Sequence, residues 1–525
     1  MKVLVLDNVS EQAVAILREQ GIEAEVSPTL PEEELIAKIP PYEGMIVRSQ
    51  TKVNARVIAA ATNLKVIGRA GVGVDNVDLD AATSKGVIVL NAPDGNTIST
   101  AEHTIAMIMA LARKIPQAHS ALKAGCWDRK SYTGVEVNGK TLGIVGMGRI
   151  GTEVARRMQA MGMTVLAFDP YLTEEKAAKL GVRLVALDEL LAAADFITVH
   201  TPLTKETKGL LNAETLKRTK PGVRIVNCAR GGIVDEEALA DAIEAGQVAG
   251  AALDVFSEEP PTNQRLIDLP QVIVTPHLGA STAEAQVNVA IDVAEEMAKV
   301  LKGEPFKNAV NLPTVRPEVM KILAPYYPLA EKLGRLIGQL TEGRLQRLEV
   351  EYSGQITEYD LNPLTTLVVE GLLKPILNSE VNMVNARVLA KQRGIKVAER
   401  REASDPDYNN KIRVKTISDR GERVVAGTFF RQNDQRVVEI DGYHFDVFPH
   451  GHLLIAPHQD KPGIIGQVGT ILGRAGINIA YMQVGRKEVG GKAIMVLTVD
   501  HEIPAAVLAQ IKQVEGIDNP VQVWL

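Results

Sequence analysis

Cysteine is scarce in this sequence. Among its 525 residues only Cys126 and Cys228 are cysteines, and they stand far apart. This scarcity excludes a disulfide scaffold and a cysteine-rich metal site, and it is typical of proteins that work in a reducing cytosol. Four histidines gather late in the chain without the spacing of a metal site, so we expect no metal. They are His444, His450, His452 and His458.

Long apolar runs are also missing. No stretch approaches the ~18 consecutive apolar residues that a membrane-spanning helix needs. The opening MKVLVLD is typical of a strand, without the basic and apolar regions of a secretory signal. The formal net charge of −6 is small for this length, which gives no electrostatic case for nucleic acid or an anionic membrane as partner. We therefore expect a soluble, cytoplasmic protein.

The length predicts three or four domains at ~100–200 residues each. Up to residue 303, short β-branched runs such as VLVLD alternate with helical patterns such as EQAVAILREQG. This alternation predicts βαβ units and parallel sheets that are buried on both faces. A long helix expected at 99–115 crosses to a second series of strands, and another expected at 281–303 returns the chain.

We therefore expect a discontinuous first domain, 1–97 with 280–312, around a second domain, 98–279. After a short linker the rhythm changes, with a helix expected near 318–342. Polar strands then follow, which predicts an α+β domain over 313–451. The last part, 452–525, reads β-α-β-β-α-β, the order of a ferredoxin-like unit.

The strongest local motif lies in LGIVGMGRIGTEVARRM. Gly146, Gly148 and Gly151 form G-x-G-x-x-G between an expected strand and helix, and Asp169 ends the next strand. Such glycines allow a tight turn, close approach of a pyrophosphate and helix–strand packing, while the helix start offers free N–H groups. Asp169 can accept a hydrogen bond from a ribose 2′-hydroxyl and would repel a 2′-phosphate. The motif therefore predicts NAD as cofactor.

Three polar residues stand at or beyond strand ends of the second domain, where ligands of open α/β sheets bind. Arg230 suits a substrate carboxylate by its bidentate fork, and its small neighbours would leave room for cofactor and substrate. His277 suits proton transfer, because histidine ordinarily titrates near neutral pH. Glu259 could fix the imidazole tautomer. Each residue alone is also compatible with a solvated or structural role, but together they favour hydride transfer on a 2-hydroxy acid.

Several motifs resemble those of the D-isomer-specific 2-hydroxyacid dehydrogenases. They are GIVGMGRIGTEVARRM, HTPLTKETKGLLN, NCARGGIVDEEAL, ALDVFSEEPP and TPHLGASTAEAQ. With GRAGVGVDNVD and the C-terminal extension, the resemblance covers the chain and narrows to the branch that oxidises 3-phospho-D-glycerate to 3-phosphohydroxypyruvate, the entry step to L-serine.

This resemblance implies a flavodoxin-like substrate domain, a Rossmann NAD domain, an intervening domain of allosteric substrate-binding type and an ACT regulatory domain. It assigns the catalytic roles to Arg230, Glu259 and His277. Beyond the motif glycines and Asp169, it implies NAD contacts at Arg149, Ile150, Thr201, Cys228, Ala229, Arg230, Asp254, His277, Gly279 and Ala280.

The substrate 3-phosphoglycerate carries about three negative charges, so one arginine is not enough. Arg48 and Arg69 follow strands of the first domain, and the Val72–Gly73 backbone could add N–H donors. Asn96 lies on the crossover, and Arg129 lies on an excursion that reaches the neighbouring subunit in the resembling family. Each arginine could instead be a solvated surface residue. Val72 stands where some relatives have threonine, so no side-chain hydrogen bond is expected there.

In the resembling family L-serine binds between paired ACT domains, which would involve His458, Asp460 and Asn478. Some relatives carry asparagine in place of Asp460. In the intervening domain a basic segment could bind anions, although a solvated basic face is favoured. Its residues are Arg387, Lys391, Arg393 and Lys396.

Two alternatives stay open, and self-association to a homotetramer is expected. One alternative is the same chemistry on another D-2-hydroxy acid, such as 2-hydroxyglutarate. The other is a non-catalytic corepressor that senses the nucleotide.

Overall fold

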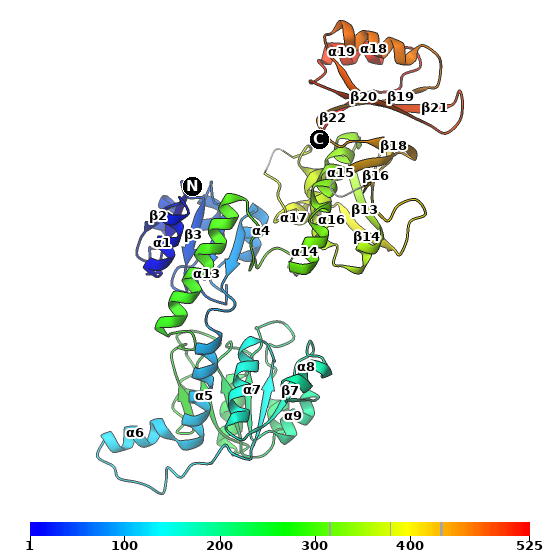
Figure 1. Cartoon of the computed structure of the whole chain (residues 1–525). Helices are drawn as coiled ribbons and strands as arrows, with labels where there is room; N and C mark the ends of the chain where they lie inside the picture. Colours follow the sequence, from blue (N-terminus) through cyan, green and yellow to red (C-terminus); the bar gives the residue numbers. More distant parts are fainter. Residues whose placement is uncertain (314–316, 378–379, 431–433) are drawn as a thin grey trace.

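A computed structural model describes residues 1–313, 317–377, 380–430 and 434–525. Within these ranges the strands form four sheets that follow one another along the chain (Figure 1). Two parallel sheets come first, a mixed sheet follows, and a small antiparallel sheet ends the chain. The predicted fold class is confirmed, while the domain boundaries drawn from the sequence remain a prediction.

The first sheet has the order β2-β1-β3-β4-β5, and all its strands are parallel. Its strands are β1 (Lys2–Val5), β2 (Glu23–Val26), β3 (Gly44–Val47), β4 (Val66–Arg69) and β5 (Ile88–Asn91). The helices between them are α1 (Glu11–Glu19), α2 (Glu32–Lys38), α3 (Ala55–Ala60) and α4 (Leu79–Lys85). This strand order is the flavodoxin-like doubly wound arrangement.

A distant helix completes this first unit. Helix α13 (Ala283–Lys302) lies beside β3 and α1 in Figure 1. A Cβ atom on Gly68 would come within 2.3 Å of Val293, so the strand needs glycine there to let the helix approach. Val293 and Met297 are fully buried in the core that α13 shares with β1 and β3.

The second sheet has the order β12-β11-β10-β9-β6-β7-β8, again with parallel pairing throughout. Its strands are β6 (Thr141–Val145), β7 (Thr164–Phe168), β8 (Arg183–Leu184), β9 (Phe196–Val199), β10 (Val223–Asn227), β11 (Val248–Leu253) and β12 (Val272–Val274). The order reverses between β6 and β9. Ligands of such sheets bind at this switch point, beyond the carboxyl ends of the strands.

Helices cover both faces of the second sheet. They are α5 (Thr97–Arg113), α7 (Arg149–Ala160), α8 (Glu174–Lys179), α9 (Leu187–Ala193), α10 (Ala213–Lys217), α11 (Glu236–Glu244) and α12 (Gln264–Ile267). The expected helix 99–115 ends at Arg113, because Lys114 has a left-handed backbone with a φ of 52°. Helix α6 (Ile115–Lys123) then starts anew, has no buried residue and projects from the unit (Figure 1).

The third sheet has the order β14-β13-β15-β16-β17-β18, in which only β13 and β14 pair in parallel. Its strands are β13 (Leu345–Gly354), β14 (Lys396–Glu402), β15 (Asn410–Ser418), β16 (Gly421–Phe429), β17 (Gln435–Ile440) and β18 (Tyr443–Val447). Its helices are α14 (Pro317–Leu323), α15 (Tyr326–Leu340), the 3-10 turn η1 (Gln355–Glu358), α16 (Asn362–Leu373) and α17 (Ala386–Gln392). The single helix expected near 318–342 is thus two helices.

The fourth sheet has the order β20-β21-β19-β22 and is antiparallel. Its elements are β19 (His452–Gln459), α18 (Ile464–Arg474), β20 (Ile479–Arg486), β21 (Lys492–Val499), α19 (Ala505–Lys512) and β22 (Val521–Trp524). The chain order β-α-β-β-α-β is the ferredoxin-like unit that the sequence predicted.

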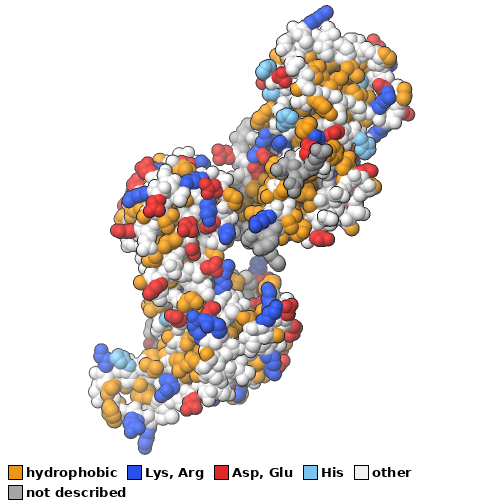
Figure 2. Space-filling model, viewed as in Figure 1, with side chains coloured by type: hydrophobic (Ala, Val, Ile, Leu, Met, Phe, Trp, Pro, Cys, Tyr) orange, Lys and Arg blue, Asp and Glu red, His pale blue; other side chains and the backbone are white. Residues whose placement is uncertain are grey.

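The described residues include neither a membrane-spanning helix nor a metal-binding cluster. No helix in those ranges is long and apolar enough to cross a membrane. No group of three or more histidine, cysteine or acidic side chains in the same ranges is arranged to hold a metal ion. Charged side chains of both signs are spread over the face drawn in Figure 2.

Candidate active site

The glycine loop after β6 uses its three glycines differently. Gly146 has a φ of +96°, and a Cβ there would lie 2.7 Å from the His200 carbonyl oxygen. A Cβ on Gly151 would lie 2.1 Å from the Gly146 carbonyl oxygen, so this glycine allows α7 to pack on the loop. Around Gly148 no heavy atom lies within 4 Å of the Cβ position. Gly148 therefore leaves open space in front of the backbone, as close approach of a ligand requires.

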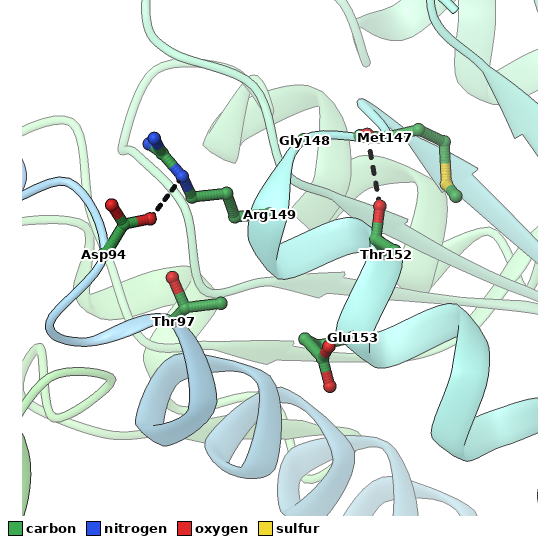
Figure 3. A pocket seen from close by; sticks show the side chains of 7 residues that line it. All are labelled: Asp94, Thr97, Met147, Gly148, Arg149, Thr152 and Glu153. Carbon is green, nitrogen blue, oxygen red and sulfur yellow. Dashed lines mark hydrogen bonds and ion pairs between the residues drawn. The ribbon is translucent and has the colours of Figure 1, made fainter. Parts of the chain in front are cut away.

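A pocket of about 430 Å³ lies at the start of α7. Figure 3 shows that Arg149 and Asp94 point toward each other at this pocket, with Thr97 on the opposite helix α5. The Arg149 Nε atom lies 2.5 Å from Asp94 Oδ1. Free N–H groups at a helix start and an arginine form a natural site for a phosphate group.

Asp169 directly follows β7 beside this loop and supports it. Its Oδ2 accepts a hydrogen bond of 2.8 Å from the Met147 amide, and its Oδ1 accepts one of 2.8 Å from the Tyr171 amide. Each carboxylate oxygen has a second lone pair, so Asp169 can still accept from a ribose hydroxyl. The sequence suggested the ribose contact but not the support of the loop.

Further residues predicted to contact NAD lie around the same edge of the sheet. The hydroxyl of Thr201 is buried and has no hydrogen-bond partner within the described ranges, and the same holds for Thr97, which the sequence did not single out. Cys228 is buried, and burial followed by the nearby Asp254 charge raises the pKa of its thiol to about 12. The thiol therefore stays neutral and is a wall of the site, not a nucleophile. The open Gly148, the unpaired hydroxyls and Asp169 together fit a dinucleotide.

Asp254, another predicted NAD contact, holds the loop that carries His277. Its side chain is almost fully buried and accepts hydrogen bonds from Thr275 Oγ1 at 2.6 Å, Leu278 N at 2.7 Å and Gly279 N at 2.8 Å. His103 Nε2 lies 3.2 Å from it. Burial raises the pKa of Asp254, but these hydrogen bonds outweigh burial and hold the pKa below its usual range. No sequence pattern indicated this role.

His277 and Glu259 lie in direct contact. His277 Nδ1 is 2.9 Å from Glu259 Oε2 and 3.1 Å from Oε1, and both side chains are about half exposed. A proton on Nδ1 would bond to the carboxylate and leave Nε2 as an acceptor. The His277 backbone has a φ of 54°, and its N–H donates to the Asp254 carbonyl at 2.9 Å. The pair therefore offers a base whose tautomer is fixed.

Arg230 follows β10, and its loop contacts the backbone of Phe256, which precedes Glu259. A Cβ on Gly231 would fall 1.8 Å from the Phe256 carbonyl oxygen, while the Phe256 N–H donates to Glu259 Oε1 at 3.2 Å. Gly231 is therefore small because the Phe256 backbone passes it, and not, as expected, to admit a ligand. Gly73 is the glycine that makes room for Arg230. A Cβ atom on Gly73 would lie 2.1 Å from the Nη2 atom of Arg230.

The side chain of Asn227 holds the loop that bears Arg230. Asn227 is buried and accepts from the Ala229 amide at 3.0 Å while its Nδ2 donates to the Arg230 carbonyl at 2.9 Å. The Arg230 Nη1 atom donates to the Ala229 carbonyl at 2.7 Å, and Nε lies 3.3 Å from Asp75 Oδ2. Asn227 was not singled out in the sequence.

The predicted substrate arginines of the first unit gather near Arg230. Burial, then the positive charges of Arg230 and Arg48, lower the pKa of Arg69 to about 10. Its Nε has no hydrogen-bond partner within the described ranges, and a Cβ on Gly71 would fall 1.5 Å from its Nη1. Positive charge is thus concentrated here without enough acceptors, as an anion site requires.

Two other predicted substrate residues differ in their surroundings. Asn96 precedes α5, is buried, and its Oδ1 has no partner within the described part of the chain. Arg129 lies in the exposed stretch 124–131 after α6. Among the hydrogen bonds and ion pairs of the described residues, none joins Arg129 to the cleft.

The predicted effector residues do not come together within one chain. His458 is buried with Nδ1 3.1 Å from the Ala456 carbonyl, and Asp460 accepts from Arg486 at 3.0 Å. Asn478 donates to Asp500 at 3.0 Å. Because β21 pairs His458 with Ala493 and Ile479 with Val499, Asn478 lies at the opposite end of the sheet.

The four basic residues of the intervening domain differ in how exposed they are. Lys391, Arg393 and Lys396 are exposed, as a solvated basic face would be. Arg387 is half-buried and donates to Thr366 Oγ1 at 2.9 Å. Burial lowers the pKa of Arg387.

Family models match three parts of the chain. Residues 105–279 match the D-isomer specific 2-hydroxyacid dehydrogenase NAD-binding domain, 322–441 match the D-3-phosphoglycerate dehydrogenase intervening domain, and 454–516 match the ACT domain. The chain is 49% identical over its full length to a D-3-phosphoglycerate dehydrogenase of Synechocystis, covering 95% of that protein. It is 48% identical to one of Archaeoglobus fulgidus, with both chains fully covered.

Solved structures resemble the first two units. The TT0316 protein of Thermus thermophilus is 38% identical, with a TM-score of 0.55 over 59% of this chain and 100% of that chain. The apo-structure of D-lactate dehydrogenase from Escherichia coli is 30% identical, with a TM-score of 0.53 over 59% of this chain and 100% of that one.

Proposed function

The chain belongs to the D-isomer-specific 2-hydroxyacid dehydrogenases, in their D-3-phosphoglycerate dehydrogenase branch, and on this premise we propose how its residues divide the reaction. The enzyme uses NAD to oxidise 3-phospho-D-glycerate to 3-phosphohydroxypyruvate, the first step of the phosphorylated route to L-serine. When bound, NAD supplies the acceptor for the hydride that leaves carbon 2.

His277 takes the hydroxyl proton at Nε2, and in the reverse direction returns it. Glu259 keeps the other ring nitrogen, Nδ1, in a hydrogen bond and stabilises the imidazolium that forms. Arg230 binds the carboxylate and polarises the oxygen on carbon 2. The contact chain from Gly231 through Phe256 to Glu259 and His277 supports this division of roles, because it joins all three loops.

The other arginines hold the rest of the substrate. Arg48 and Arg69 take the phosphate, the amides of Val72–Gly73 add donors for the carboxylate, and Asn96 is a further polar contact. The lowered pKa of Arg69 supports this assignment, because an anion beside it would remove the repulsion from Arg230 and Arg48. Glycerate lacks the phosphate, so the positive charges of Arg48 and Arg69 would have no anionic partner when it binds.

A comparison of substrates tests the proposal. We expect kcat/KM for 3-phosphoglycerate to exceed that for D-glycerate by at least 100-fold, since a charge-assisted contact contributes about 1.5–3 kcal/mol and two or more are lost. Equal values would contradict the phosphate assignment. Parallel assays with D-2-hydroxyglutarate test the second substrate, whose extra carboxylate could also occupy the arginines. An Arg230→Lys variant with full activity would contradict the carboxylate clamp.

Self-association and regulation follow from surfaces outside this cleft. Helix α6 and the exposed stretch 124–131 form an arm that projects from the second unit. On this arm Ile115, Leu122 and Trp127 are more than half exposed, and Figure 2 shows hydrophobic side chains there. We propose that this arm and the ACT sheet pair the chains into a homotetramer, with Arg129 reaching a neighbour's phosphate site. L-serine then binds between paired ACT domains. Light scattering, and assays with and without L-serine, test these statements.

A further inference from the structure

Arg230, the proposed carboxylate clamp, already has a carboxylate partner within the chain. Its Nε lies 3.3 Å from Oδ2 of Asp75, which stands in the loop between β4 and α4 of the first unit. The Asp75 side chain is 80% exposed, whereas that of Arg230 is 29% exposed. Asp75 has no other hydrogen bond or ion pair within the described ranges. This ion pair therefore crosses between the two sheets and is easily exchanged.

The glycine loop repeats this arrangement. Arg149 belongs to α7 of the second unit, and Asp94 belongs to the crossover after β5 of the first (Figure 3). Their side chains are 56% and 64% exposed, and the pair lies at the pocket that fits the pyrophosphate. Two arginines proposed to bind ligand anions thus each hold an acidic residue from the other side of the cleft.

We propose that Asp75 and Asp94 are competing carboxylates that set the affinity of the site. Asp75 occupies the guanidinium that the substrate carboxylate needs, and Asp94 occupies the one that the pyrophosphate needs. In Arg230 the Nη1 atom already donates to the Ala229 carbonyl, so the edge formed by Nε and Nη2 is left for a ligand. Both acids contact the Nε atom of their arginine, so a ligand that binds in a fork through Nε and Nη2 must displace its acidic competitor. This inference rests on the proposed function and adds two residues that lower affinity without taking part in catalysis.

The expected change in affinity follows from how exposed the two ion pairs are. Exposed ion pairs stabilise by about 0.2–1 kcal/mol, which corresponds to roughly 1.4- to 5-fold in affinity. The Asp75 pair belongs near the upper value, because the arginine is largely buried and the loop geometry is fixed. A residue that instead held Arg230 in its productive orientation would change kcat when removed, which separates the two roles.

Asp75→Asn tests the substrate half. We expect KM for 3-phosphoglycerate to fall about two- to five-fold while kcat stays within two-fold. Asp80→Asn is the matched control, since Asp80 is an exposed acid on the adjacent helix α4 and should leave both constants unchanged. The inhibition constant of glycerol 3-phosphate, which lacks the carboxylate, should fall by a smaller factor, because the Asp75 charge also acts on Arg69. An unchanged KM, a lower kcat, or an equal gain for both anions would overturn the proposal for Asp75.

Asp94→Asn tests the cofactor half without turnover. We expect NADH to bind about two- to five-fold more tightly, measured by its fluorescence in the absence of substrate. Glu102→Gln on the exposed face of α5 is the control and should leave the dissociation constant unchanged. Unchanged or weaker NADH binding by Asp94→Asn would overturn this half. Thermal melts confirm folding, and Asp75→Ser and Asp94→Ser replace any variant that does not fold.

Failure of this inference is distinct from failure of the proposed function. If wild-type enzyme turns over 3-phosphoglycerate and Arg230→Lys is impaired, the function stands whatever the aspartate variants do. If Arg230→Lys keeps full activity, the proposed clamp fails first.

Discussion

Two glycines of one loop should respond to alanine in opposite ways. A Cβ on Gly151 would lie 2.1 Å from the Gly146 carbonyl oxygen, and Gly146 cannot retreat, because its own Cβ position lies 2.7 Å from the His200 carbonyl. Gly151→Ala must therefore shift backbone, at a cost of about 1–3 kcal/mol in the free energy of unfolding. Gly148 has open space and a φ of −69°, which alanine adopts freely.

Gly148→Ala should therefore fold normally and lose the cofactor. Its cost as a helix N-cap stays below about 1 kcal/mol. A methyl group in the open space would block approach of the pyrophosphate to the loop amides, whose charge-assisted bonds contribute about 1.5–3 kcal/mol. That loss corresponds to roughly a 10- to 150-fold rise in the NADH dissociation constant.

Thermal melting and NADH fluorescence titration measure the two effects on the same samples. The Tm of Gly151→Ala should be lower than that of wild type, and the Tm of Gly148→Ala should lie within a few degrees of the wild-type value. If Gly148→Ala binds NADH as wild type does, the dinucleotide does not lie over this loop. If Gly151→Ala is as stable as wild type, the steric reasoning is wrong.

Three further outcomes are expected. His277→Gln should lower kcat by about 10²–10⁴-fold, while the NADH dissociation constant, measured by fluorescence, stays within two-fold. Asp254→Asn should lower kcat and thermal stability together. Since the pKa of Asp254 is held below its usual range, its support is present at neutral pH and lost as pH falls through that lowered pKa, which urea unfolding at pH 7 and near pH 2 would detect. The charge of Arg69, whose pKa is lowered to about 10, is lost as pH rises through 10, so KM for 3-phosphoglycerate should rise between pH 9 and pH 11, and less so in Arg69→Ala.

The nucleotide loop could be predicted because its chemistry is local. Strand, glycine turn and helix follow one another without interruption, and Asp169 comes one βα unit later. The first unit was also predictable in outline, since the periodicity at 281–303 indicated a helix, and α13 spans Ala283–Lys302. In both cases the signal lies in the period of the pattern or in residues that are neighbours in the chain.

The contacts of Asp75 and Asp254 could not be predicted, because they depend on strand order. Asp254 serves a loop after a different strand, β12, and Asp75 meets a residue of another sheet. Gly231 had been interpreted as clearance for a ligand, yet the structure places the Phe256 backbone against it. The sequence shows that a residue is small but not what approaches it.

The predicted helix boundaries were wrong at two places where the structure interrupts an expected helix. The expected helix near 318–342 ends at Leu323 and restarts after Pro325, whose ring removes a backbone donor. Proline explains this break. At Lys114 the break depends on a left-handed residue between α5 and α6, for which a lysine gives no warning.

The predicted effector residues lie at opposite ends of the ACT sheet. His458 and Asp460 lie at one end of the ACT sheet and Asn478 at the other, so a serine that contacts all three must lie between two copies. Asp460 is held by Arg486 and Asn478 by Asp500, so the ligand also has to displace these partners. A serine site formed by these three residues would therefore require two associated chains, whereas the proposed NAD contacts all belong to one chain. Dilution should abolish inhibition by L-serine at protein concentrations where NADH still binds; inhibition that persists in a monomer, shown by light scattering, would contradict a site between copies.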